Sequence, residues 1–149
     1  MKLSALFADF LRFCLREEAQ EPAGLAEMDW DALYDFGYKQ AILGVFFHGI
    51  KRLSKSEHRP GRQQILKWYG SCSFIERANR QAYKDASMLT ALMLKEYGVH
   101  SCVLKGQTNA LMYPDPYMRT SGDIDLWTDA ETLDVIRISR QLDKHGEIG

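Results

Sequence analysis

Residues 103–127, VLKGQTNALMYPDPYMRTSGDIDLW, carry the strongest structural signals in this sequence. They overlap a short apolar run, Val99–Leu104, that is partly β-branched and too short for a buried helix, so we predict a strand there. The run ends at Lys105 and Gly106, and a second predicted strand covers Asp123–Thr128. We interpret the rest of the chain as a scaffold for this hairpin-like pair of strands.

The segment between the two predicted strands should turn back as a short helix. Gln107–Tyr113 has the composition for it, and the helix should stop at Pro114-Asp115-Pro116. Each proline lacks an amide hydrogen and restricts the residue before it, so a helix cannot continue through this run.

Asp123 and Asp125 are the main candidates for chemistry. Successive side chains of a strand point to opposite faces, so these two carboxylates should project together while Ile124 and Leu126 face the core. Their Cα atoms would lie about 7 Å apart, two residues of strand rise. Paired carboxylates of this kind suit a hard divalent cation such as Mg²⁺.

The first half of the chain reads as helices. Leu3–Glu17 has one apolar stripe at helical spacing, and Glu21-Pro22-Ala23-Gly24 interrupts it. Asp29 or Asp31 should cap the next helix, which carries Trp30, Leu33, Tyr34 and Tyr38. A further apolar segment covers Ala41–Leu53 and includes two glycines, which suggest tight helix packing or a break.

Two more helices complete the predicted elements. After a polar loop at Ser54–Gly61, Arg62–Tyr97 contains no proline and should form one long helix, bent near Gly70 and ended by Gly98. Its basic residues should lie on a solvated face: Lys67, Arg77, Arg80 and Lys84. Asp129 should cap the last helix, Ala130–Lys144, and its apolar residues should face the core: Leu133, Ile136, Ile138 and Leu142.

Composition bounds the class of protein. The chain has 149 residues, a net charge of −1 and 46% apolar residues, which suit a globular protein and not a nucleic-acid coat.

Cys14, Cys72 and Cys102 have no metal-ligand spacing, and we expect three buried thiols. The four histidines show no zinc spacing, and Ser71-Cys72-Ser73 lies in a helical pattern without a base. No stretch is apolar for long enough to span a membrane, and Asp9 with Arg12 argues against a signal peptide, so we expect a cytoplasmic protein.

The expected fold class is α+β: a helical N-terminal region, residues 1–97, followed by a core with a small mixed sheet, residues 98–149. The two parts could also form one continuous domain. Since an isolated pair of strands is only marginally stable in water, we expect further strands to follow residue 149 or a partner chain to complete the sheet.

Taken together, Leu104-Lys105-Gly106, Tyr113-Pro114-Asp115-Pro116, Arg119 and Gly122-Asp123-Ile124-Asp125-Leu126 resemble the uncharacterised bacterial nucleotidyltransferase family. That family belongs to the DNA polymerase β-type nucleotidyltransferase superfamily, and the specific likeness spans roughly residues 99–144. The resemblance implies Mg²⁺-dependent or Mn²⁺-dependent transfer of a nucleoside monophosphate from an NTP to a hydroxyl group. It also implies that Asp123 and Asp125 are the catalytic metal-binding pair.

The same resemblance suggests the residues that would bind the substrate. Gly106 matches the family's glycine between strand and helix, where the absence of a side chain lets phosphates approach backbone N–H groups. Superfamily members often have serine next, whereas this chain has Gln107, which can still donate a hydrogen bond. Lys105 and Arg119 are the nearest cations for the phosphates, although Arg119 could instead pair with an aspartate to hold the loop. The superfamily's third carboxylate has no counterpart here, since capping or solvent exposure explains Glu131 and Asp134 better.

Several alternatives stay open at this stage. The acceptor could be a protein side chain, a small molecule or an RNA end, and the helical region could pack on its own sheet or form a homodimer. The missing third carboxylate and Gln107 also fit a non-catalytic binding or regulatory module, for example in a toxin–antitoxin-like pair. A metal-dependent glycosyltransferase also uses Asp-x-Asp, but it needs an extended nucleotide-binding region before the motif, where this chain has mostly helices.

Overall fold

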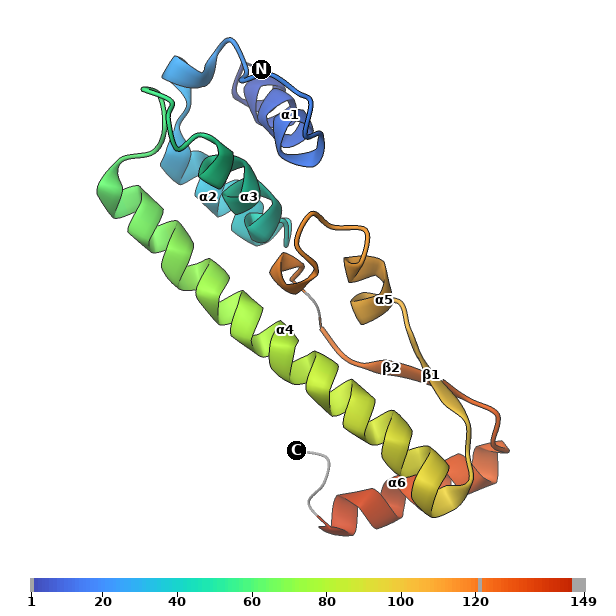
Figure 1. The fold of residues 1–149 in the computed structure, drawn as a ribbon. Helices are drawn as coiled ribbons and strands as arrows, with labels where there is room; N and C mark the ends of the chain where they lie inside the picture. The colour runs from blue at the N-terminus through green and yellow to red at the C-terminus, as the bar shows by residue number, and fades with distance from the viewer. Residues whose placement is uncertain (1, 121, 146–149) are drawn as a thin grey trace.

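The computed structural model describes residues 2–120 and 122–145 and shows an α+β fold that extends along one long helix (Figure 1). Three short helices gather at the N-terminal end of this helix, and a small sheet with a last helix lies at the other end. The elements in chain order are α1 (Lys2–Leu15), η1 (Leu25–Glu27), α2 (Trp30–Lys39), α3 (Leu43–Arg52), α4 (Arg62–Tyr97), β1 (Ser101–Leu104), α5 (Gly106–Ala110), η2 (Pro116–Met118), β2 (Asp125–Thr128) and α6 (Thr132–His145).

The long helix α4 has the predicted bounds. The Gln64 side chain accepts a hydrogen bond from the N–H of Gly61 at its start, and Gly98 ends it with a positive φ of 65°. The helix is continuous through Gly70, which has open space around it. Although α4 has 36 residues, no helix in the described part of the chain is both long and apolar enough to cross a membrane.

An aromatic core lies between α1, α2, α3 and the first half of α4. The side chains of Phe10, Leu33, Phe46 and Trp68 are at most 1% exposed. The ring centroid of Phe46 lies 5.9 Å from that of Phe10 and 6.5 Å from that of Trp68, within the range of favourable aromatic pairs. Burying each such side chain contributes roughly 1.5–3 kcal/mol, so this core is the main source of stability for the helical region.

Helices α1 and α3 pack closely enough to require a glycine. A Cβ atom at Gly49 would lie 2.2 Å from the sulfur of Cys14, so no other residue fits there without movement. Arg52 of α3 then satisfies carbonyl groups at the end of α1 and its following turn, and its guanidinium lies 4.0 Å from the ring centroid of Phe13. The accepting carbonyls belong to Phe13, Arg16, Glu17 and Ala19.

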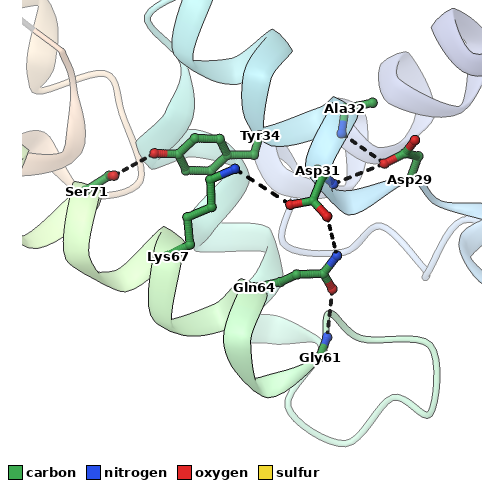
Figure 2. A network of polar contacts seen from close by, with 8 residues as sticks. All are labelled: Asp29, Asp31, Ala32, Tyr34, Gly61, Gln64, Lys67 and Ser71. Atoms are coloured by element: carbon green, nitrogen blue, oxygen red, sulfur yellow. Dashed lines mark hydrogen bonds and ion pairs between the residues drawn. The ribbon is translucent and has the colours of Figure 1, made fainter.

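A polar network joins α2 to the start of α4 (Figure 2). Asp29 caps α2 by accepting hydrogen bonds from the N–H groups of Asp31 and Ala32, which confirms the first of the two predicted caps. Asp31 accepts a hydrogen bond from Gln64 and pairs with Lys67, whose Nζ lies 3.6 Å from the carboxylate. The network therefore sets the position of α2 on α4 around the buried aromatic core.

The two strands are antiparallel, and the register pairs Ser101 with Thr128 and Leu104 with Asp125. The described residues thus form an antiparallel pair where we predicted a mixed sheet, while the α+β class is confirmed. Val103 and Leu126 are half-buried on the face toward α4, whereas Trp127 and Cys102 are exposed on the other. The prediction that all three cysteines are buried is therefore wrong for Cys102, because its position in the strand register faces solvent.

The last helix packs through a narrower stripe than predicted. Ile138 and Leu142 join Met93 and Val99 in a small second core, but Leu133 and Ile136 are 76% and 42% exposed. In the described part of the chain α6 packs on this small cluster, and its other apolar positions stay in contact with solvent.

Asp129 does not cap α6 as predicted. Its carboxylate accepts hydrogen bonds from the backbone N–H of His100 at 2.9 Å and lies 3.0 Å from Nδ1 of the same histidine. It therefore closes the end of the strand pair, and the last helix begins only at Thr132.

Candidate functional site

The predicted Asp-x-Asp motif lies where the second strand begins. Asp125 is the first residue of β2, and Asp123 precedes the strand, which starts two residues later than predicted. Strand alternation therefore does not set the direction of the Asp123 side chain. Both residues are exposed, so both carboxylates are open to solvent and to a ligand.

Lys105 connects the first strand to this motif. It lies between β1 and α5 with a φ of 49° and a ψ of −108°, a region that only glycine adopts readily. Its Nζ lies 3.8 Å from a carboxylate oxygen of Asp125. Because both side chains are at least half exposed, this ion pair adds little stability and leaves the two groups available.

Arg119 approaches the same turn from the loop before β2. A Cβ atom at Gly106 would lie 3.7 Å from Nη1 of Arg119 and 3.7 Å from the carbonyl oxygen of Asp123, so these three residues meet at one point. Nη1 of Arg119 is buried and has no hydrogen-bond partner in the described part of the chain. A buried guanidinium nitrogen without a partner costs free energy, and an anionic ligand would satisfy it.

Helix α4 holds the loop that carries Arg119. The side-chain amide of Asn79 is buried and donates hydrogen bonds to the carbonyls of Tyr117 and Arg119. The guanidinium of Arg80 lies 4.0 Å from the ring centroid of Tyr117. Asn79 was not among the predicted site residues, and its signal in the sequence is a polar residue between apolar positions of the long helix.

Gly44 of α3 fixes the other side of this loop. A Cβ atom there would lie 2.1 Å from the carbonyl oxygen of Met118, so only glycine allows η2 to approach so closely. Met118 is buried in the aromatic core of the helical region. The residue before Arg119 is therefore anchored in the best-packed part of the molecule.

The side chain of Gln107 is buried, whereas Asp123 and Asp125 are exposed. Only 4% of Gln107 is exposed, and both polar atoms of its side-chain amide lack partners in the described residues. Its backbone carbonyl accepts a hydrogen bond from the hydroxyl of Tyr83 at 2.6 Å. Burial raises the pKa of Tyr83, the neighbouring Tyr117 raises it further and Arg119 opposes them, so Tyr83 stays a neutral donor.

Asp123 and Asp125 carry the type of ligand that Mg²⁺ takes in proteins. Among residues 2–120 and 122–145 no group of three or more Asp, Glu, His and Cys side chains is positioned to hold a metal. Mg²⁺ keeps several waters and is usually bound by one or two carboxylates together with substrate phosphates. Exposed Asp123 and Asp125, with two cationic side chains beside them, match this mode better than an all-protein metal cage.

The other nucleophile candidates have structural roles. The hydroxyl of Ser71 lies 2.7 Å from that of Tyr34 across the α2–α4 interface. Burial raises the pKa of Cys72 to about 12, and the same cause raises the pKa of Cys14 to about 12. Neither thiol can supply a thiolate near neutral pH, so we assign both to packing.

A comparison with protein-family models matches residues 26–146 to a family described as uncharacterised nucleotidyltransferase. The match covers well over half of the chain. This chain belongs to that nucleotidyltransferase family. The family match begins before α2 and so includes most of the helical region together with every candidate site residue named above. No curated protein and no solved structure matches the chain.

The family match confirms the resemblance seen in the strand–turn motifs and extends it to helices that precede them. The sequence motifs lie between residues 99 and 144, whereas the family's matched region extends through α2, α3 and α4. The helices that hold Tyr117, Met118 and Arg119 thus lie within the region that matches the family model.

Proposed function

We propose that this protein transfers a nucleoside monophosphate from an NTP to a hydroxyl-bearing acceptor, with Mg²⁺ or Mn²⁺ bound by Asp123 and Asp125. Membership in a nucleotidyltransferase family supports NTP binding and nucleotidyl transfer as the general chemistry. The observation that carries the specific proposal is the meeting of Lys105, Gly106, Arg119 and the Asp123–Asp125 motif around one turn. This arrangement offers carboxylates for a cation and cations for phosphates at the same place.

The proposed reaction is a displacement at the α-phosphorus of the NTP. The acceptor's hydroxyl oxygen forms a bond to the α-phosphorus, the bond to the bridging oxygen breaks, and pyrophosphate leaves with the bonding electrons. The hydroxyl proton passes to solvent or to a base on the acceptor's side. When bound, the metal ion would neutralise charge on the phosphate oxygens and lower the pKa of the attacking hydroxyl.

The chain's own residues would position the triphosphate. Lys105 could contact the phosphates as a point charge once it leaves Asp125, which costs little because the pair is exposed. Arg119 has a planar guanidinium suited to two parallel hydrogen bonds, and its unpartnered Nη1 already lies beside Gly106. We assign Arg119 the larger share of transition-state stabilisation, since its charge is partly desolvated.

The DNA polymerase β-type superfamily is the wider group that we propose for this chain. The β1–turn–α5 unit followed by Asp-x-Asp at the start of β2 supports this placement. We further propose that the described strand pair, β1 and β2, is the part of the sheet that presents the metal-binding motif.

A non-catalytic binding module is the second candidate, and one observation favours it. The described residues bring no third carboxylate to Asp123 and Asp125. A protein of this kind would bind an NTP through the same turn and would release no pyrophosphate. Pyrophosphate release in the presence of candidate acceptors therefore separates the two functions.

Titration calorimetry of NTPs with Mg²⁺ tests the shared part of both functions. We expect metal-dependent binding by the wild type and its loss in Asp123→Asn/Asp125→Asn, because both metal ligands lose their charge. The matched control is Glu131→Gln/Asp134→Asn, which removes two exposed carboxylates near the start of α6 and should bind like the wild type. Unchanged binding by a folded Asp123→Asn/Asp125→Asn variant would refute the metal site.

A further inference from the structure

A cavity of about 260 Å³ lies between α4 and the β1–α5 unit, apart from the exposed aspartates. Its walls are mainly apolar and include Ala86 of α4, Val103 of β1 and Leu111 after α5. Leu111 is 69% exposed, so the cavity opens to solvent on this side. The size and the mostly apolar lining are typical of a site for part of a small molecule.

Gln107 lines this cavity and carries an unsatisfied carboxamide. Its side chain is 4% exposed, and neither its oxygen nor its nitrogen has a partner within the described residues. Three other polar side chains there are already engaged, since the hydroxyls of Tyr83, Thr90 and Thr108 donate to the carbonyls of Gln107, Ala86 and Val103. The remaining one, Ser87, is exposed to solvent. A buried amide left without partners calls for an explanation, and a ligand provides one.

We propose that this cavity is the nucleobase subsite, in which Gln107 forms paired hydrogen bonds with the base edge and the apolar walls contact its faces. This inference rests on the proposed function. A carboxamide presents a donor beside an acceptor, and glutamine makes this bidentate contact with the N6 and N7 atoms of adenine. Adenine is therefore the base that we expect to bind best.

The position of Gln107 in the chain links the cavity to the phosphate-binding turn. Gln107 follows Gly106 directly, and Lys105 precedes both, so the Cα atoms of Lys105 and Gln107 are at most about 7 Å apart. The hydroxyl of Tyr83 holds the backbone of Gln107 through its carbonyl, which fixes the amide relative to α4. One nucleotide could thus place its base against α4 and its phosphates at Lys105 and Arg119.

This arrangement gives a physical reason for glutamine at position 107, where superfamily members often have serine. A serine at position 107 would be shorter and has no amide, whereas glutamine places at the cavity wall a group that can distinguish bases. Gln107 is accordingly assigned to base selection, and phosphate contact is left to its neighbours.

Titration calorimetry with ATP and inorganic tripolyphosphate, each with Mg²⁺, tests the assignment on the full chain. Gln107→Leu should weaken ATP binding roughly 5- to 150-fold, the range for losing a bidentate base contact, and should leave tripolyphosphate binding unchanged. Gln63→Leu makes the same chemical change on the exposed first turn of α4 and should alter neither. Equal weakening of both ligands by Gln107→Leu, or no weakening of ATP, would overturn the nucleobase subsite.

Two further measurements, a melting temperature and an NMR titration, distinguish a ligand-binding role of Gln107 from a structural one. The melting temperature of ligand-free Gln107→Leu should equal or exceed that of the wild type, because an apolar side chain replaces an unpaired amide; a clear loss would mean that Gln107 has a structural role and would count against the subsite. Adenosine should shift the side-chain amide resonances of Gln107 in an NMR titration. A shift with adenosine but no ATP binding at Asp123 and Asp125 would refute the proposed function and keep the cavity's role. No shift with adenosine or ATP would mean that water alone occupies the cavity.

Discussion

The two ends of α4 have opposite characters. At its N-terminal end, Trp68 and its aromatic neighbours form a core in which the largest side chains are fully buried. At its C-terminal end, Met93 belongs to a small cluster with only a few apolar partners. The buried side-chain atoms that lack hydrogen-bond partners in the described residues all lie outside the aromatic core, in Ser101, Gln107 and Arg119.

This difference means that one part of the molecule provides most of the stability and another part carries the candidate chemistry. Polar atoms that are buried without partners cost free energy, so a chain keeps them only where the remaining structure is stable enough or where a ligand satisfies them. In this protein the aromatic core supplies the stability, and the turn near Arg119 and Gln107 holds the unsatisfied groups. The contacts of Gly44 with Met118 and of Asn79 with the same loop connect the two regions.

The largest expected effect comes from the aromatic core. Trp68→Ala should lower the free energy of unfolding by about 3–5 kcal/mol, because Trp68 is 1% exposed and its loss leaves a large cavity. Denaturant unfolding followed by circular dichroism measures the change. Trp127→Ala is the matched control in the other region, where the side chain is 54% exposed, and should cost about 1 kcal/mol or less. Similar losses for the two variants would contradict the contrast drawn between the regions.

An intermediate effect should come from the contact between the regions. Gly44→Ala places a Cβ atom 2.1 Å from the carbonyl oxygen of Met118, so we expect a loss of about 1–3 kcal/mol and weaker nucleotide binding, since Arg119 follows Met118. Gly70→Ala is the control, because Gly70 has open space around it on α4. It should stabilise the protein by about 0.5–1 kcal/mol and leave binding unchanged. Destabilisation by Gly70→Ala, or none by Gly44→Ala, would show that the close approach is not the cause.

The smallest effect concerns two residues that adopt a positive φ without being glycine in the described part of the chain, Ala41 in the helical region and Lys105 at the turn. Lys105→Gly should be about 1 kcal/mol more stable than Lys105→Ala, because only glycine adopts this backbone geometry without strain. Both variants should weaken nucleotide binding equally through the lost charge. Ala41→Gly should also stabilise the fold, with no change in binding. Thermal unfolding and calorimetry measure the two quantities, and wild-type binding by both Lys105 variants would remove the phosphate role of this residue.

The sequence predicted α2 and α4 well because local rules govern their ends. Asp29 was one of two predicted caps, and α4 runs between a proline-containing loop and Gly98 as expected. The α+β class and the family were also confirmed. These features depend on capping groups, on residues that cannot continue a helix and on apolar spacing, all of which are visible without neighbours.

Predictions that depended on neighbouring elements were less accurate. Leu133 and Ile136 have the spacing of a core stripe but are exposed, and among the described residues it is Ile138 and Leu142 that pack in the small second core. Asp129 could act as a helix cap in sequence, yet the backbone N–H of His100 lies close enough to take its carboxylate. Cys102 is exposed because the pairing register, and not its own polarity, decides its face.

The sequence by itself determined which residues carry the candidate chemistry, because carboxylates, cations and a glycine after a strand are recognisable from their types and spacing. Only the tertiary structure decided how they meet. Asn79 and Gly44 hold the loop of Arg119 against helices that are far away in sequence, and the packing of α5 on α4 buries the amide of Gln107. Local sequence preferences cannot predict such contacts, because each contact depends on how closely two elements that are far apart in the sequence approach one another.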